Sequence, residues 1–179
     1  MEFFEAVEKR VSVRRYRPDP VSREDLLRVL AAARRAPSWE NLQCARFLVV
    51  TDPGKKNAVF EAVHEGNPAK KAVAAAPAAV LLCADPADSG SRAGLDYFLV
   101  DAGIAFEHLF LAAAALGLGT CWVGVFDEAA LKKAFGIPEG TRVVALTPLG
   151  YPEKQSSPRP RKELSELVHF ETWGGTGKK

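Results

Sequence analysis

The fold is decided by the stretch YFLVDAGIAFEHLFLAAAALGLGTCWVGVF, which spans residues 97–126. Its first two thirds are the most apolar part of the chain, which raises the question of whether they cross a membrane. Asp101, Glu107 and His108 interrupt the apolar run, so the usual requirement of about 20 consecutive apolar residues is not met. We therefore expect a buried helix from about residue 96 to residue 116.

The surroundings of this helix can be read from its ends and its composition. Gly117 and Gly119 end the helix, and residues 119–126 after them predict a strand. The helix is apolar on nearly all sides, which is typical of a helix that is wholly buried. A chain of 179 residues has little else with which to cover it. We therefore expect part of the cover to come from a second subunit.

Outward from this stretch, helices and strands are interleaved along the chain. Ser22 followed by Asp25 resembles a capping box at the start of an apolar helical stripe. The expected helices lie at about 23–35, 55–64 and 128–136, and the expected strands at 46–51, 78–85 and 142–151. This order predicts an α/β or α+β class with helices covering a central sheet. One domain is expected over 1–173, a candidate lid over 86–94 and a disordered tail over 174–179.

Composition restricts the classes of function. The 24 basic residues nearly balance the 22 acidic ones, which argues against a nucleic-acid-binding protein. Acidic residues within residues 1–10 are wrong for a signal peptide, so a cytoplasmic protein without a membrane anchor is expected. Cys44, Cys83 and Cys121 are far apart and odd in number, which favours free buried thiols over disulfides. Neither they nor the scattered histidines have the spacing of metal ligands.

Sequence motifs for nucleophilic catalysis and nucleotide binding are absent. The chain has no G-x-S-x-G elbow, no G-x-G-x-x-G after a strand and no P-loop. Two cationic sets remain: Arg10 and Arg14 around Ser12, and Arg159 with Arg161. Alternate residues of an extended chain point to one side, so the first set could face a single phosphate group. A solvated charge run explains the same spacing at least as well, and spacing cannot bring the two sets together.

Four segments in a fixed order carry a family resemblance. They are RVSVRRY, APSWENLQCARFLVV, GLGTCWVGVFDEAALKKAFGIP, and LGYP followed by PRPRKEL. In this order they resemble the nitroreductase family over about residues 3–173. The resemblance implies a three-layer α/β/α fold of the α+β class, with a mixed, mainly antiparallel sheet, in an intertwined homodimer. It also implies that the long helix lies at the dimer interface and that two FMN sites are built from both subunits.

The resemblance assigns the cationic residues to an FMN phosphate site. The family's R-x-S-x-R stretch, which grips the phosphate and ribityl groups, falls on Arg10, Ser12 and Arg14. The family's C-terminal arginine falls on Arg161, with Arg159 as a second candidate. The remaining cations of the N-terminal cluster, Lys9, Arg15 and Arg17, are expected to be solvated.

The resemblance also assigns residues to the flavin ring. The loop P-S-x-x-N-x-Q, which the partner subunit supplies, falls on Pro37, Ser38, Asn41 and Gln43. The strand under the ring falls on Trp122, Val123 and Gly124, and the Gly124 backbone N–H is the expected donor to N5. No side chain is assigned a catalytic role, because the flavin carries the chemistry.

Some positions depart from the family pattern. Val11 stands where relatives have a second arginine, Trp39 replaces a small residue, and Cys44-Ala45 replaces a common Pro-Trp pair. The last two departures lie near the mouth of the implied flavin site, so they bear on which acceptor is used. The E-Y-K type of lid found in dehalogenating relatives is not recognisable in the sequence.

The resemblance implies a ping-pong oxidoreductase. NADH or NADPH would pass hydride to N5 of FMN, and a nitroaromatic, quinone or similar flat acceptor would then take the same place. Two alternatives stay open: a dimer that binds or sequesters flavin without turnover, and a specialised relative that breaks down flavin or removes halogen. The sequence does not choose between the two nicotinamides.

Overall fold

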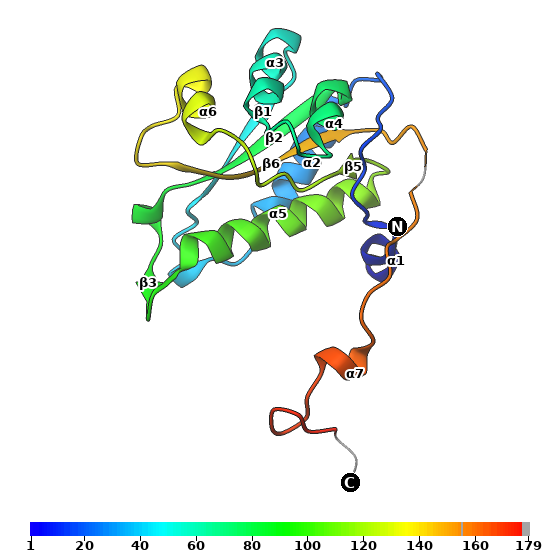
Figure 1. Ribbon diagram of the computed structural model, residues 1–179, viewed down its shortest axis with the longest axis vertical. Helices are drawn as coiled ribbons and strands as arrows, with labels where there is room; N and C mark the ends of the chain where they lie inside the picture. The colour runs from blue at the N-terminus through cyan, green and yellow to red at the C-terminus, as the bar shows by residue number, and fades with distance from the viewer. Residues whose placement is uncertain (155, 177–179) are drawn as a thin grey trace.

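The structure is a computed structural model that describes residues 1–154 and 156–176. A body of helices around a sheet runs from the N-terminus to about Lys154, and an arm then leads away from it (Figure 1). The tail predicted to be disordered, 174–179, is described as far as Thr176, and its last three residues lie outside the described part.

The centre of the body is a four-stranded sheet with the order β1-β2-β6-β5, in which neighbours are antiparallel. Its strands are β1 (Ala45–Val50), β2 (Ala78–Ala84), β5 (Gly119–Thr120) and β6 (Arg142–Gly150). At the β5 edge, Ser12 forms a parallel bridge with Thr120. The sheet is therefore mixed and mainly antiparallel, as predicted.

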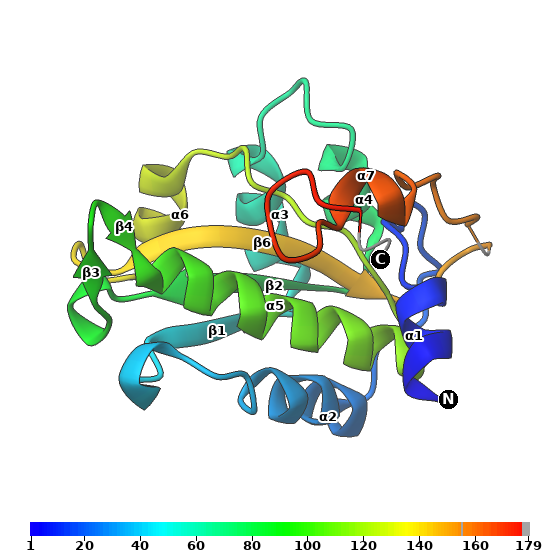
Figure 2. The ribbon, with the colours of Figure 1, turned by 90° about the horizontal axis from the view of Figure 1, so that it is seen from below.

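Helices cover both faces of this sheet and give it three layers. One face carries α2 (Arg23–Ala33) and α5 (Tyr97–Ala115), the other carries α3 (Pro53–Ala62), α4 (Lys70–Ala75) and α6 (Glu128–Phe135), and α1 (Phe3–Lys9) packs against α5 (Figures 1 and 2). Side chains of β2 alternate between the two faces, so Val80 and Leu82 join one core while Leu81 and Cys83 join the other. Every residue of β2 is buried, which explains its continuously apolar sequence.

Local signals set the ends of several helices. Ser22, Asp52 and Asp127 each accept a hydrogen bond from a backbone N–H in the first turn of the helix that follows. Gly136 ends α6 in a left-handed conformation with φ of 65°. These caps are encoded within a few residues, and the helix boundaries expected from the sequence agree with the structure to within a few residues.

The helix α5 is buried on one side only. Phe106 and Leu109 are fully buried against the sheet, whereas Leu99 and Val100 are each 50% exposed. Within the described ranges, α5 is the one helix long and apolar enough to cross a membrane, and 44% of that stretch is buried in the body. A core helix of a folded domain passes the same test of length and composition, and the packing of α5 on the sheet is of this kind.

One sequence-based strand boundary was wrong. The strand predicted over 119–126 stops at Thr120, because the N–H of Cys121 donates to the Thr147 hydroxyl at 2.9 Å instead of to a strand carbonyl. The candidate lid, residues 86–94, contains a short 3-10 helix, η2 (Pro86–Asp88), and the strand β3 (Ser91–Arg92), which forms a hairpin with β4 (Leu95–Asp96). The hairpin turn needs left-handed backbone at Ala93, with φ of 53°, which alanine does not signal.

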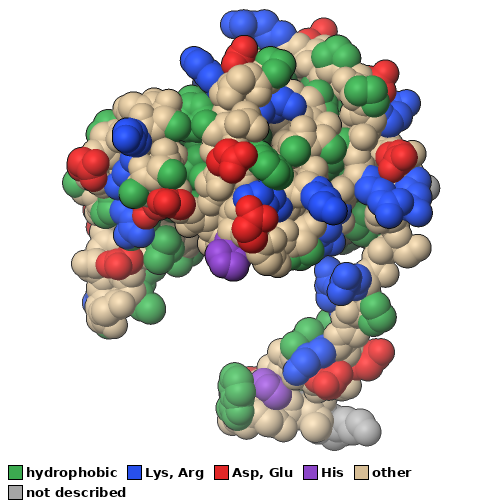
Figure 3. Space-filling model, turned by 45° about the horizontal axis from the view of Figure 1, so that its top comes forward, with side chains coloured by type: hydrophobic (Ala, Val, Ile, Leu, Met, Phe, Trp, Pro, Cys, Tyr) green, Lys and Arg blue, Asp and Glu red, His purple; other side chains and the backbone are tan. Residues whose placement is uncertain are grey.

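The arm, residues 156–176, extends away from the body and carries the short helix α7 (Leu164–Leu167) (Figure 1). Its apolar side chains are largely uncovered: Leu164 is 75% exposed and Trp173 is 93% exposed. The space-filling view shows apolar and charged groups together on this projecting segment (Figure 3). A single chain therefore gives the arm nothing to pack against.

Candidate functional site

The N-terminal segment that holds Ser12 lies along the edge of the sheet. The N–H of Val13 donates to the Thr120 carbonyl at 2.8 Å, and the Val13 side chain is buried. The backbone comes this close because Gly119 has no side chain: a Cβ there would lie 2.7 Å from the Val13 Cβ. Ser12 and Arg14, on either side of Val13, are exposed, as the alternation of an extended chain requires.

A basic cavity opens beside this segment. Its volume is about 180 Å³, and it is lined by Ser12, Arg14, Arg15, Lys154 and Ser156. Three cations and two hydroxyl groups match the oxygens of a phosphate monoester, which accept charge-assisted hydrogen bonds. The residues present therefore fit a phosphate-bearing cofactor such as FMN.

Two members of this cavity could not be found from the sequence. Arg15 is exposed, as expected, but its place in the lining of the cavity was not expected. Lys154 lies far along the chain, and it arrives because Glu153 donates its N–H to the Arg15 carbonyl at 3.0 Å. That contact joins two distant segments, so no local signal could have indicated it. Arg17 does not line this cavity; its guanidinium lies over the Tyr151 ring, 5.2 Å from the ring centre.

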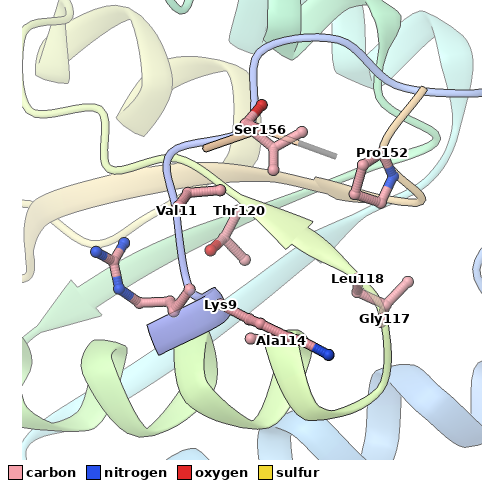
Figure 4. Close-up of a pocket in the computed structure, with 10 residues that line it drawn as sticks. Lys9, Val11, Ala114, Gly117, Leu118, Thr120, Pro152 and Ser156 are labelled. Carbon is pink, nitrogen blue, oxygen red and sulfur yellow. The ribbon is translucent and has the colours of Figure 1, made fainter. Parts of the chain in front are cut away.

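Arg10 does not line the basic cavity in this chain. Its Nε lies 3.6 Å from a carboxylate oxygen of Glu107 on α5. Burial raises the pKa of Glu107, and the nearby Arg10 guanidinium partly offsets that rise. Arg10 instead lines a neighbouring cavity of about 240 Å³, where residues such as Val11, Thr120 and Leu118 surround a hollow at the end of α5 (Figure 4).

The C-terminal arginines lie on the arm. Arg161 donates to the carbonyl of Arg159 at 3.1 Å, so its guanidinium is occupied locally. Neither arginine lines the basic cavity, although Ser156, three residues before Arg159, does. The two cationic sets are therefore adjacent through the root of the arm but are not brought together within one chain.

The loop over residues 37–43 is tightly ordered. Glu40, Asn41 and Gln43 have φ of 46°, 59° and 57°, a conformation that costs energy for side chains other than glycine. Several hydrogen bonds hold it: among them, Trp39 N–H donates to Oδ1 of Asp101 at 2.9 Å, and Gln43 N–H donates to the Ser38 hydroxyl at 2.9 Å. Asn41 and Gln43 are left exposed; the Gln43 amide nitrogen donates to the Asn41 carbonyl at 3.1 Å, which leaves its second N–H and its oxygen to bind a polar ring edge.

Part of this loop borders a second cavity, of about 410 Å³. Pro37, Ser38 and Gln43 line it together with Asp101 and Arg46. Asn41 is not among its lining residues, because the loop turns that side chain outward.

The segment of Trp122, Val123 and Gly124 follows β5 and runs between β6 and α5. Val123 pairs with Leu146 through two backbone hydrogen bonds of 2.9 Å, and its side chain is fully buried. Both backbone polar groups of Val123 are therefore paired with β6, and its side chain lies in the core. Trp122 is 46% exposed and packs edge-on against Phe106, with ring centroids 5.6 Å apart.

The burial of a lysine next to this segment was not predicted from the sequence. Lys70 is 6% exposed and donates to the Val63 carbonyl at 2.7 Å and to the Glu65 carboxylate at 2.6 Å. Val63 bridges to Phe126, so the lysine lies beside the chain that follows Gly124. A single lysine at the start of an alanine-rich run gives no sequence signal for burial.

The predicted site residues lie at opposite ends of α5. The loop over 37–43 is bonded to Asp101 in the first turns of the helix, whereas Ser12 is bridged to Thr120, just past its last residue, Ala115. At 1.5 Å per residue, the helix between these points is roughly 20 Å long. One chain therefore presents two half-sites that are too far apart to hold the same flavin, which is consistent with the prediction that the partner subunit supplies the loop.

Comparison with known proteins agrees with this geometry. The family described as the nitroreductase family matches residues 7–151. The chain belongs to the nitroreductase family. An Archaeoglobus fulgidus relative, named as an NADH dehydrogenase/NAD(P)H nitroreductase, is 34% identical over 178 residues, which cover 96% of this chain and 99% of the relative.

Solved structures of nitroreductases have the same fold. The crystal structure of a nitroreductase family protein from Clostridium novyi is 36% identical, with a TM-score of 0.83 over 99% of this chain and 97% of the other. A Desulfovibrio desulfuricans nitroreductase structure in complex with FMN is 28% identical, with a TM-score of 0.84 over 96% and 98%. The family, the fold and the enzyme class predicted from the sequence, an NAD(P)H-dependent flavin oxidoreductase, are thereby confirmed.

Proposed function

We propose that this nitroreductase is a homodimer that binds FMN and uses NADH or NADPH to reduce nitroaromatics, quinones or similar flat acceptors in a ping-pong reaction. The observation that carries the proposal is the basic cavity of Ser12, Arg14, Arg15, Lys154 and Ser156 at the edge of the sheet. It provides a phosphate site in a family in which one relative was solved with FMN.

The role of the chain is to bind and orient the cofactor. FMN supplies the hydride chemistry when bound, and no protein acid or base is needed for that. The cavity would hold the phosphate, and the segment of Trp122 and Gly124 would lie under the ring with the Gly124 N–H toward N5. Lys70, buried beside the chain that follows Gly124, is paired there with the Glu65 carboxylate at 2.6 Å.

A second copy of the chain would complete the site. Leu99 and Val100 of α5 and the apolar residues of the arm form more uncovered apolar surface than a monomer usually keeps. Packing two α5 helices against each other in opposite directions would bring the Asn41 and Gln43 loop of one copy to the basic cavity of the other. The arm would gain a surface to pack on, and Arg159 and Arg161 would be free to turn toward the phosphate. The cytoplasmic location stays a prediction.

The proposal is tested by flavin binding and turnover. The purified protein should show flavin absorbance or gain it when FMN is added, and it should oxidise NADH or NADPH with menadione or a nitroaromatic. Protein that stays colourless with added FMN contradicts the proposal. Protein that binds FMN without turnover supports a flavin-sequestering dimer instead.

Arg14→Ala tests the phosphate site, with Lys133→Ala as a control of equal charge change on α6. Each charge-assisted hydrogen bond is worth about 1.5–3 kcal/mol, so FMN should bind roughly 10- to 100-fold more weakly to Arg14→Ala. Lys133→Ala should bind FMN like the parent. Equal FMN affinity in both variants would show that Arg14 does not bind the phosphate.

A further inference from the structure

Asp101 is a buried carboxylate on which three segments of the chain converge. It lies on α5 and is 5% exposed, and among the residues described it is the one acidic side chain in the buried core. Its Oδ1 accepts the N–H of Trp39 at 2.9 Å. Its Oδ2 accepts the Ser89 hydroxyl at 3.0 Å and lies 3.5 Å from the Cys44 thiol.

The donors in these contacts are neutral groups, and the ion pairs of the described residues do not include Asp101. A buried carboxylate without a cation is costly unless donors surround it, and removing those donors leaves the charge uncompensated. Here the donors belong to the 37–43 loop, to the residue before β1, and to the segment before the hairpin of β3 and β4. A core residue chosen only for packing would be apolar, so the carboxylate points to a role in joining these segments.

The 37–43 loop needs such an anchor. Its left-handed residues, Glu40, Asn41 and Gln43, are unfavourable as a free chain. The bond from Gln43 to Ser38 closes the loop on itself but does not attach it to the body. Two other bonds attach it: the Trp39 N–H donates to Asp101, at the residue just before the left-handed run, and the Arg46 guanidinium on β1 donates to the Gln43 carbonyl at 2.7 Å.

The indole of Trp39 joins the same loop to the hairpin. Its ring centroid lies 4.1 Å from that of Tyr97, at the start of α5. A Cβ on Gly90 would lie 2.4 Å from Nε1 of Trp39, so the backbone before the hairpin rests directly on the indole. Ser89, the neighbour of Gly90, is bonded to Asp101. Loop and hairpin are thus fastened together through one carboxylate and one aromatic ring.

We propose that Asp101 is a positioning residue that holds the loop presenting Asn41 and Gln43 and locks the hairpin of β3 and β4 to it as one wall of the flavin and acceptor site. The part of this proposal that concerns the site rests on the proposed function; the fastening of the two segments does not. Burial and the neighbouring Asp101 raise the pKa of Cys44 to about 11, which keeps that thiol protonated as a donor.

Asp101→Leu and Asp101→Asn form the central comparison. Leucine has a similar volume and accepts no hydrogen bond, whereas the asparagine oxygen can still accept the Trp39 N–H and its amide can bond to the Ser89 hydroxyl. We expect FMN affinity at least tenfold weaker in Asp101→Leu and within about threefold of the parent in Asp101→Asn. Rescue by asparagine separates positioning from a general loss of stability.

Trypsin cleavage gives a readout that does not need the cofactor. Arg92 is exposed in the hairpin, so release of the hairpin should speed cleavage after Arg92 about tenfold in Asp101→Leu and not in Asp101→Asn. Cleavage at sites on α6, such as Lys133, should keep its parental rate. Faster cleavage at both places would indicate global destabilisation and overturn the positioning role.

Two further variants decide the case if Asp101→Leu does not fold. Ser89→Ala removes only the bond between the hairpin and Asp101. Trypsin should therefore cleave after Arg92 faster than in the parent, while FMN affinity stays within about twofold of the parent. Gly90→Ala pushes on the Trp39 indole and should both speed cleavage and weaken FMN binding, whereas Gly140→Ala, which meets no atom within 4 Å, should do neither. The proposal is overturned if Asp101→Leu is cleaved at the parental rate and binds FMN with the parental affinity. The same result in both Ser89→Ala and Gly90→Ala would also overturn it. A parent protein that binds no FMN refutes the proposed function, and the cleavage rates still test the fastening.

Discussion

Gly119→Ala should loosen the segment that carries Ser12 from the sheet. A Cβ at residue 119 would lie 2.7 Å from Cβ and Cγ2 of Val13 and 2.9 Å from its Cγ1. Carbon atoms in contact are normally about 3.5–4.0 Å apart, so the two segments must separate by roughly 1 Å. Val13 is β-branched and buried, so its side chain cannot turn away.

The cost can be worked out from two contributions. Overpacking of a buried site costs about 1–3 kcal/mol. The bond from the Val13 N–H to the Thr120 carbonyl, 2.8 Å long, would be stretched beyond hydrogen-bond distance, which costs about 0.5–1.5 kcal/mol more. The free energy of unfolding should therefore fall by roughly 2–4 kcal/mol. For a chain of this size that lowers Tm by roughly 5–15 °C.

Urea denaturation measures the change, and FMN titration measures its effect on the site. The urea midpoint should fall with an unchanged m-value, and FMN should bind at least tenfold more weakly, because Ser12 and Arg14 move with Val13. Gly140→Ala is the matched control, since a Cβ there meets nothing within 4 Å. If Gly119→Ala is as stable as Gly140→Ala, the close approach does not constrain the segment and the reasoning is wrong.

Further predictions concern the core and its titrating groups. Leu131→Ala empties a fully buried position on α6 and should lower the free energy of unfolding by about 2–5 kcal/mol without changing FMN affinity, as urea denaturation and titration would show. Burial holds the pKa of Cys44 and Cys83 at about 11, so these thiols should react with Ellman's reagent only on unfolding. Because the folded-state pKa is raised, their contribution to stability is complete below pH 9 and should be lost as the pH rises toward 11. The bond to Arg142 lowers the pKa of Glu128, so the contribution of Glu128 to stability is present above pH 4.5 and is lost as the pH falls below that value. In Glu128→Gln, the loss of unfolding free energy at acid pH should be smaller by about 0.5–1 kcal/mol, as urea titrations at several pH values would show.

The elements with strong local signals were predicted well. The helix expected at 23–35 is α2, which begins after the Ser22 cap and ends at Ala33. The strand expected at 78–85 is β2, which ends at Ala84. Apolar periodicity and caps act within a few residues, so they can be read before the chain is folded. The early end of β5 could not be read, because it depends on the Thr147 hydroxyl, which reaches Cys121 only across the sheet.

The candidate site was predicted in part. Ser12 and Arg14 are exposed on either side of the buried Val13, as the alternation of an extended chain predicts, and the resemblance placed this segment in the right family. Lys154 and the buried Lys70 were missed, because each reaches its position through contacts with distant segments. Arg10 was grouped with Ser12 by its spacing, but Glu107 on α5 draws its side chain away from the basic cavity in this chain.

By itself the sequence determined the family, the order of helices and strands, and a cationic segment suited to a phosphate. These follow from short-range patterns and from motifs in a fixed order. Only the tertiary structure decided which cations share a cavity, that Asp101 fastens the 37–43 loop, and that the two half-sites lie at opposite ends of α5. The reason is physical: a binding site depends on distances between segments remote in sequence, and those distances exist only once the sheet and its helices have packed.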